Sequence, residues 1–445
     1  MGKKLQYLFF FLQTFLTRHK SVLFLSFFLG FLITAISRII FPYLTSALES
    51  KTETIGIIGQ FNESSLPLSI ENKISMGLTH LLASGEASPA AALSWKTNDK
   101  GNIYTITLDN SLKWHDGKEF TASDVVYQLK GAQFKVITKN ILEIDLTDPY
   151  SPLPVLLSHP LIREGLIGLG PYVVTKENFK GDTLTELILT PQKKESLPIL
   201  RYRFYNNSKD AVLAFKLGEI NTIESLNNPG EFLSWKNAEI EETTKYDLYT
   251  GVFFNLDNPN FKEKEVRQAL SYAISPIDSY EKALTPISPL SWGYSKRIRL
   301  YSYDPESALK ILSKSPLASD SSQLTISTFP SLLSTAQKVK DSWGKVGVKS
   351  KIKVSTDIPD NFDVMILSQR IPPDPDQYQY WESNQDQTNI TGYSNPKIDK
   401  LLEDGRREQD IEKRKKIYAD FQRYLVDDAP VVFLYYPKNY TVVRK

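Results

Sequence analysis

The segment LTISTFPSLLSTAQKVKDSWGKVGVKSKIKV, residues 324–354, decides the fold class of this chain. It opens with a strand-like run from Leu324 to Thr328 and continues into a helical pattern from Leu333 to Val346. Val348, Ile352 and Val354 then alternate with polar residues, which is typical of a half-buried strand. Strand, helix and strand in succession predict a βαβ unit.

Strand and helix patterns also alternate along the rest of the chain. Short apolar runs predict buried strands at Thr54 to Ile58, Gly251 to Asn255 and Phe362 to Leu367. A long amphipathic helix is expected over Asp410 to Val426, and a final strand over Val431 to Tyr436. The fold class is therefore α/β, with no internal repeat.

Two further helices are expected in the first third of the chain. Apolar residues recur every four positions from Ile70 to Leu82, which predicts a helix over this stretch. Thr121 and Asp124 have the spacing of an N-cap and an acidic N3 residue, which predicts that a second helix begins there. The expected buried side of that helix includes Val125, Val126 and Leu129.

An apolar segment lies near the N-terminus. Ser21 to Ile36 carries no charge, and if Arg38 snorkels towards the headgroups the apolar stretch extends to Tyr43. That length is enough to cross a bilayer. The two interpretations are an uncleaved anchor over residues 21–43 and a cleaved signal peptide. The run exceeds the usual apolar core of a signal peptide and no A-x-A-like site follows, which favours the anchor.

The charges around this segment predict its orientation. Arg38 is the only cation between the apolar run and Lys51, whereas four cations precede the run: Lys3, Lys4, Arg18 and Lys20. Residues 1–20 are therefore expected to be cytoplasmic, and a polar linker over residues 44–53 leads to the outer face of the plasma membrane. Residues 5–16 are apolar but short, so they are expected to lie along the interface; a second span there would invert the topology.

Composition excludes several classes of protein. The 445 residues include 41% hydrophobic ones, enough for a large core in two or three domains. The net charge is +2 without a basic stripe, so the chain is not expected to bind nucleic acid. The absence of cysteine excludes disulfides, thiolate metal sites and lipid attachment through an N-terminal cysteine.

The sequence contains no motif that specifies an enzyme. The four histidines lack metal-ligand spacing, and the nucleophile-elbow, P-loop and dinucleotide-binding patterns are missing. The acid pairs Asp374/Asp376 and Asp427/Asp428 are better explained as residues of a Pro-rich turn and of a helix end than as acid–base groups. We therefore predict no catalytic residue, no metal site and no cofactor.

Several blocks of the sequence, in order along the chain, resemble the bacterial extracellular solute-binding protein family 5, the peptide- and nickel-binding components of ABC importers. The similarity covers roughly residues 54–445 and is carried by Leu93–Trp95, Tyr104–Leu108, Leu112–Lys118, Thr121–Tyr127, Gly168–Tyr172, Phe254–Asn255, Val266–Ala273, Tyr303–Pro305, Asp374–Pro375, Gly392–Pro396 and Ala429–Pro430.

The resemblance implies a two-lobed fold of the periplasmic-binding-protein type, class II, with a discontinuous first lobe. Residues 54–250 and 429–445 are assigned to the first lobe, and residues 251–428 to the second. A subdomain of the first lobe, about residues 83–167, is shorter than is usual in the family. The implied function is capture of a small solute or peptide by hinge closure, as a monomer, for the permease subunits of an importer. The alternative is an extracytoplasmic receptor, sensor or enzyme that reuses this fold.

The loop Arg370 to Trp381 directly follows a buried strand, where α/β folds tend to bind ligands. Its aromatic residues either line the site or lie under the loop. Peptide-binding members commonly carry an Asp that pairs with the ligand's amine, and Ile371 stands at that position. This suggests a ligand without a free amine there, or an amine met by Asp374. The candidate ligand-binding residues are Asn255, Trp292, Gln369, Arg370, Ile371, Asp374 and Trp381.

Overall fold

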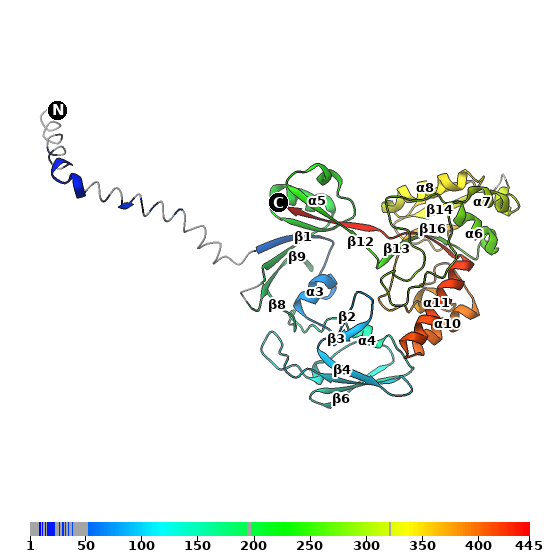
Figure 1. Ribbon diagram of the computed structural model, residues 1–445, viewed down its shortest axis with the longest axis horizontal. Helices are drawn as coiled ribbons and strands as arrows, with labels where there is room; N and C mark the ends of the chain where they lie inside the picture. Colours follow the sequence, from blue (N-terminus) through cyan, green and yellow to red (C-terminus); the bar gives the residue numbers. More distant parts are fainter. Residues whose placement is uncertain are drawn as a thin grey trace.

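The computed structural model describes residues 52–193, 197–319 and 322–445, together with residues 9, 11, 14, 16–22, 26, 29, 30, 32, 34 and 38. Two lobes lie beside each other, and each is built on one large sheet (Figure 1). The first-lobe sheet contains, in spatial order, β12 (Ala238–Thr244), β18 (Lys438–Arg444), β11 (Thr222–Leu226), β1 (Thr52–Ile58), β10 (Ile199–Tyr205), β9 (Thr183–Pro191) and β8 (Tyr172–Lys180).

Helices cover both faces of the first-lobe sheet. Ile55 and Ile57 of β1 pack with α3 (Leu68–Ile74). Ile58 points to the opposite face, because side chains alternate along a strand, and it packs with α5 (Ser208–Leu217). The single-turn elements η1 (Glu63–Ser65) and η3 (Gly230–Ser234) complete this lobe.

The second-lobe sheet contains, in spatial order, β15 (Ser350–Val354), β14 (Leu324–Thr328), β16 (Val364–Arg370), β13 (Leu248–Phe254) and β17 (Val431–Tyr435). One face packs with α6 (Lys264–Tyr272), α7 (Pro305–Leu312) and α8 (Leu333–Gly344). The other face packs with α10 (Pro396–Arg407) and α11 (Ile411–Asp428). The shorter elements are η4 (Pro259–Phe261), η5 (Pro316–Ala318), η6 (Pro330–Leu332) and α9 (Tyr378–Trp381).

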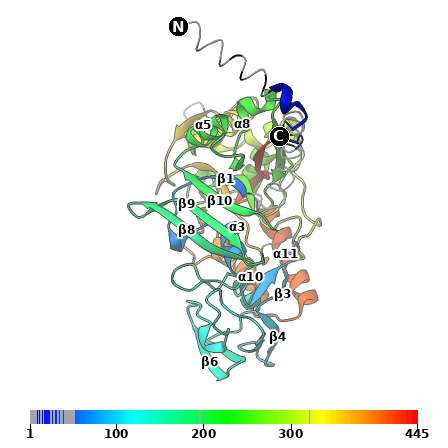
Figure 2. The same ribbon diagram turned by 90° about the vertical axis from the view of Figure 1, so that its left-hand side faces the viewer.

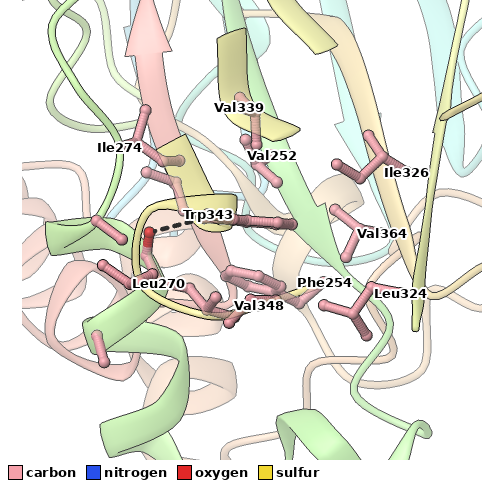
Figure 3. Close-up of a cluster of buried hydrophobic side chains, with 14 of the residues drawn as sticks. Val252, Phe254, Leu270, Ile274, Leu324, Ile326, Val339, Trp343, Val348 and Val364 are labelled. Carbon is pink, nitrogen blue, oxygen red and sulfur yellow. Dashed lines mark hydrogen bonds between the residues drawn. The ribbon is translucent and has the colours of Figure 1, made fainter. Parts of the chain in front are cut away.

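The predicted βαβ unit is confirmed, since β14 and β15 pair in parallel and α8 connects them. Trp343 of α8 is fully buried against Phe254, Ile326 and Val364, as Figure 3 shows. Its indole N–H donates to the carbonyl of Leu270 at 3.1 Å. The helix periodicity therefore places its largest side chain at the centre of the core and leaves no unpaired polar atom on it.

The chain crosses between the two sheets twice. Residues 245–247 connect β12 to β13, and Tyr436 and Pro437 connect β17 to β18. Strand β17 is hydrogen-bonded to β13 in the second-lobe sheet, although the sequence assigned residues 429–445 to the first lobe. Residues 248–250, also assigned there, belong to β13. Both crossings connect the same two sheets by two or three residues, so they can act as a hinge between the lobes.

A subdomain extends the first lobe. Its antiparallel sheet contains, in spatial order, β4 (Ala92–Thr97), β5 (Ile103–Leu108), β7 (Ile141–Leu146) and β6 (Ala132–Thr138). The short helix α4 (Leu153–Leu156) packs beside it. The hairpin of β2 (Thr79–Leu81) and β3 (Ala87–Pro89) connects this subdomain to α3 (Figure 1).

Both helices predicted in this region are wrong in extent. The first ends at Ile74, because Gly77 packs against the backbone of Leu157 and the chain then enters β2. The second is a single turn, η2 (Ala122–Asp124), although the expected capping box is present. The chain leaves that turn towards β6, and Val126, expected to be buried, is 72% exposed.

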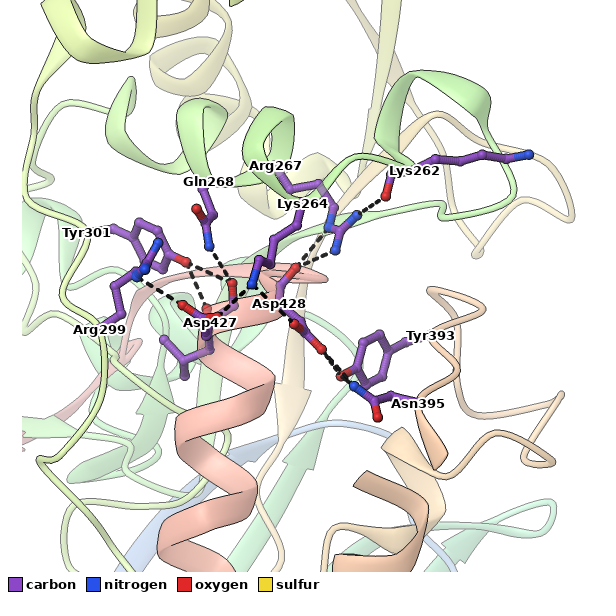
Figure 4. Close-up of polar contacts among 11 residues, drawn as sticks. Lys262, Lys264, Arg267, Gln268, Arg299, Tyr301, Tyr393, Asn395, Asp427 and Asp428 are labelled. Atoms are coloured by element: carbon purple, nitrogen blue, oxygen red, sulfur yellow. Dashed lines mark hydrogen bonds and ion pairs between the residues drawn. The ribbon is translucent and has the colours of Figure 1, made fainter. Parts of the chain in front are cut away.

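The acid pair Asp427/Asp428 ends helix α11, as predicted. Arg267 and Gln268 of α6 donate to the carbonyls of Asp428 and Asp427 at 3.0 and 2.6 Å (Figure 4). These contacts satisfy carbonyls that a helix end leaves without partners. The Asp427 carboxylate pairs with Lys264 at 2.8 Å. The pair is therefore a structural joint between helices.

Much of the predicted membrane anchor, residues 21–43, lies outside the described residues, and so do residues 44–51 of the linker. In the described part of the chain, no helix has the length and apolar character needed to cross a membrane.

Candidate ligand-binding cleft

A cavity of about 390 Å³ lies between the two lobes. The first lobe lines it with residues 81–85 of the β2–β3 hairpin, with residues 243–247 at the end of β12 and in the first crossing, and with Asn439. The second lobe lines it with Ser288, Leu290, Ser291 and residues 371–373. The cavity therefore lies beside the hinge and is built by both lobes, which is where a solute can stabilise a closed arrangement.

The lobes touch each other at the floor of this cavity. The amide of Trp292 donates to the carbonyl of Ser84 at 3.0 Å, and the amide of Ile371 donates to the carbonyl of Asp247 at 2.7 Å. Gly85 has φ of +82°, and a Cβ atom placed there would lie 2.2 Å from the carbonyl oxygen of Pro373. Only glycine allows the two backbones to approach this closely.

Ile371, one of the candidate ligand-binding residues, lines the cavity and is 3% exposed. Asp374 lies behind it, where its two carboxylate oxygens accept from the Arg414 guanidinium at 2.6 and 3.0 Å. Burial would lower the pKa of Arg414, but the Asp374 carboxylate raises that pKa above its ordinary value. Asp374 is therefore engaged within the second lobe and presents no free oxygen to the cavity in this structure.

The other candidates are not among the residues that line the cavity. Asn255 donates to the carbonyl of Phe362 at 2.9 Å, and Gln369 accepts from the hydroxyl of Tyr249. Trp381 is 1% exposed in the second-lobe core, and Arg370 is exposed. Trp292 has its ring against the Arg414 guanidinium, 4.9 Å from ring centre to Cζ. Its backbone amide is the group that donates to Ser84 of the first lobe.

Sequence reasoning missed the first-lobe side of the cleft. Ser84 and Gly85 form a turn signal that the predicted helix over residues 70–82 obscured, because that helix left no room for a hairpin at this point. Residues 245–247 carry no motif. They cross between the lobes because β12 belongs to the first-lobe sheet and β13 to the second-lobe sheet. No local sequence pattern encodes that change of sheet.

The lobes also meet at a second place, formed by Tyr104, Tyr150 and Ser151 of the subdomain with Arg406 and Gln409 of the second lobe; we call it the outer contact. The amide of Ser151 donates to the carbonyl of Arg406 at 2.7 Å. The hydroxyl of Tyr104 donates to Oε1 of Gln409 at 3.0 Å. Ser151 thus satisfies a carbonyl at the C-terminal end of α10.

Arg406 has an aromatic ring from each lobe beside it. Its Cζ lies 4.2 Å from the ring centre of Tyr378 and 5.0 Å from that of Tyr150. Its Nε pairs with the Asp376 carboxylate at 2.9 Å. Burial raises the pKa of Asp376, and Arg406 opposes that increase. A second cavity of about 620 Å³ lies beside the outer contact.

Replacing Tyr104 by phenylalanine is expected to shift the lobes towards an open arrangement. The ring still packs, but the bond to Gln409 is lost, and a neutral hydrogen bond contributes about 1 kcal/mol. Small-angle scattering should show a larger radius of gyration. Tyr127→Phe is the matched control, because the Tyr127 hydroxyl donates within the first lobe, to the carbonyl of Leu157 at 2.9 Å. An equal change in both variants would contradict a role for the outer contact.

The site shows no arrangement for chemistry. In the described residues there is no group of three or more His, Asp or Glu side chains that could hold a metal ion. The cavity is lined by hydroxyls, apolar side chains and the two charged residues Lys245 and Asp247. A mixture of apolar side chains and a few polar groups is usual in small-molecule binding sites.

Residues 86–391 match the family model of bacterial extracellular solute-binding proteins, family 5. The chain belongs to this family. The match begins at Glu86, the last residue of the β2–β3 turn, and includes both sides of the first crossing and the loop at Ile371. Family 5 is a family of non-catalytic, extracytoplasmic solute-binding proteins, so the resemblance inferred from ordered blocks is confirmed.

Two relatives illustrate the match. The chain is 26% identical to the oligopeptide-binding protein AppA of Bacillus subtilis, over 83% of this chain and 82% of that protein. The structure of NikZ from Campylobacter jejuni in complex with Ni(L-His) superposes with a TM-score of 0.72 at 24% identity, covering 89% of this chain and 94% of that one. The structure of AppA with a nonapeptide gives a TM-score of 0.67 at 23% identity, covering 89% and 95%. These structural matches confirm the α/β periplasmic-binding-protein fold.

Proposed function

We propose that this protein is the solute-binding component of an ABC importer, acts as a monomer, and captures a peptide or a similar small molecule between its lobes. The observation that carries the proposal is the cavity beside the crossings, lined by residues 81–85 and 243–247 from one lobe and 371–373 from the other. A solute that touches both linings stabilises the closed state, and the closed state is the form that docks on permease subunits.

The chemistry of the cavity narrows the class of solute. Ile371 brings no charge to the second-lobe lining, and the Asp374 carboxylate is already paired with Arg414. An ammonium buried there without a partner would cost several kcal/mol. We therefore propose a ligand whose end next to Ile371 is uncharged, such as a peptide with a blocked N-terminus or one whose amine lies outside the cavity.

Native mass spectrometry of the gently purified full chain identifies any copurified solute, and calorimetry then tests its class. We expect peptides with free and with acetylated N-termini to bind with affinities within about threefold of each other. Ile371 brings no charge, and Asp374 is paired with Arg414. Asp247, the carboxylate of the lining, is exposed, so that water screens its attraction for an amine. Binding that requires the free amine and is unaffected by Asp374→Ala would contradict this ligand class. Failure of every peptide, with tight binding of a sugar or a metal chelate, would replace peptides by that solute.

We also propose that residues 21–43 form a single-pass anchor, with residues 1–20 cytoplasmic. The support is the uncharged run from Ser21 to Ile36, preceded by a basic flank. The full chain should stay with the membrane pellet after alkaline carbonate extraction, whereas a variant without residues 1–43 should be released. Processing near Tyr43, seen as a shorter mass of the mature protein, would show a signal peptide instead.

A further inference from the structure

Three leucines of the first lobe lie with their side chains in water. Leu213 and Leu217 of α5 are 55% and 66% exposed, and Leu233 of η3 is 75% exposed. The elements are neighbours, because Lys216 pairs with Glu231 at 2.6 Å and the buried ring of Phe215 packs against that of Phe232 at 5.2 Å. We call these three residues the leucine surface.

The leucine surface lies at the end of the first lobe where β1 begins. Helix α5 ends at Leu217, and the turn that follows leads to Asn221. The side chain of Asn221 accepts from the amide of Thr54 in β1 at 2.9 Å. Figure 1 shows β1 and the C-terminus at this same end, away from the second lobe. The leucine surface is therefore close to the point where the chain enters the lobe.

The length of chain before β1 limits how far this end can lie from a membrane. If the apolar segment ends at Tyr43, residues 44–51 separate it from Thr52. A fully extended chain reaches at most about 3.3–3.6 Å per residue, so the tether spans no more than roughly 30 Å. The second lobe lies on the opposite side of the first lobe from the end where β1 begins (Figure 1 and Figure 2). The end of the first lobe that carries the leucine surface therefore stays within roughly 30 Å of the bilayer.

The charges around the leucine surface suit an anionic bilayer. Lys209 and Lys236 flank it, are exposed, and have no ion-pair partner in the part of the chain that the structure describes. Asp210, the carboxylate of α5, is also exposed and accepts from the side-chain amide of Asn207 at 2.8 Å. Glu231 is neutralised by Lys216. Glu239 and Glu241 of β12 alternate with Ala238 and Ile240, which pack under α5, so their carboxylates point to the other face. Cations beside apolar side chains are the usual combination in interfacial binding.

We propose that the leucine surface rests on the outer leaflet of the membrane that anchors the chain, and so holds the first lobe in one orientation while the second lobe moves. The inference rests on the proposed anchor. It assigns a lipid contact to Leu213, Leu217 and Leu233 that solute binding itself does not require. Fixing one lobe would present the cleft to the permease in a constant direction.

The test uses the absence of cysteine in the chain, which makes each introduced thiol the only labelling site. Nitroxide labels are attached to Leu217→Cys and Leu233→Cys in the full chain, reconstituted in phosphatidylcholine vesicles containing phosphatidylglycerol. Leu309→Cys and Leu300→Cys on the second lobe, 47% and 58% exposed, are matched controls on a helix and on a loop. We expect the ratio of collisions with oxygen to collisions with a water-soluble nickel chelate to be about threefold higher at 217 and 233.

The charge contribution is tested with Lys209→Glu/Lys236→Glu, which should lower that ratio in the anionic vesicles. Equal collision ratios at all four labelled positions would overturn the lipid contact. Protection of 217 and 233 that appears only after the permease is added would overturn it in favour of a protein contact. Release of the chain by carbonate would show that the anchor itself is absent. A chain that is retained but carries unprotected labels would refute only the lipid contact, so the two failures are distinguishable.

Discussion

Replacing Gly85 by alanine should keep the two lobes from closing and weaken solute binding at least about tenfold, which corresponds to 1.4 kcal/mol. The added Cβ would lie 2.2 Å from the carbonyl oxygen of Pro373 on the opposite lobe. The Cβ position is fixed by the backbone of residue 85 and the oxygen of Pro373 is a backbone atom, so no side-chain rotation relieves the overlap. The lobes must move apart, and the population able to bind solute falls by the same factor as the affinity.

Gly117→Ala is the matched control for this variant. Gly117 has φ of +83°, almost the same as the +82° of Gly85, but nothing lies within 4 Å of the position its Cβ would take. Both substitutions therefore introduce the same left-handed backbone strain, about 1 kcal/mol, while only Gly85→Ala blocks the approach of the lobes. Calorimetry with the copurified solute and small-angle scattering measure the two effects. Equal affinities of the two variants would contradict a closing contact at Gly85.

Regular periodicity made the second lobe predictable. The βαβ unit of residues 324–354 appears as β14, α8 and β15, because a buried stripe that ends in Trp343 can be satisfied in one way only, against the sheet. The long helix α11 and strand β17 also lie where their patterns indicate, but β17 is not the final strand, because β18 follows it. In these segments the local pattern and the tertiary contacts agree.

The first third of the chain was less predictable, because tertiary contacts override the pattern there. Ile70, Ile74 and Leu78 are all fully buried, as the four-residue spacing requires, yet Leu78 lies in a bend outside the helix. Close packing of Gly77 on the backbone of Leu157 ends the helix, and Leu157 is far away in sequence. The same limit applies to the cleft. The loop that contains Ile371 is recognisable in the sequence because it directly follows a buried strand, whereas its neighbours in the first lobe depend on how the sheets pack.

Replacing Asp374 by alanine is expected to lower the free energy of unfolding by about 3–5 kcal/mol, because it leaves a buried guanidinium without its counter-ion. The side chains of Asp374 and Arg414 are each 7% exposed. Arg414 keeps its hydrogen bonds to the carbonyl of Gly405 at 2.9 Å and to the hydroxyl of Tyr418 at 3.3 Å, but no carboxylate replaces Asp374. Urea unfolding followed by tryptophan fluorescence measures the loss.

Asp420→Ala is the control on the same helix as Arg414. Asp420 pairs with Arg423 at 2.9 Å, but the two side chains are 53% and 48% exposed, and exposed pairs contribute at most about 1 kcal/mol. The double variant Asp374→Ala/Arg414→Met should recover part of the loss, because an apolar side chain then fills the site without an unpaired charge. The experiment also separates two roles for Asp374. If its carboxylate met the amine of a ligand instead of holding Arg414, Asp374→Ala would weaken binding of free-amine peptides and leave the unfolding free energy unchanged.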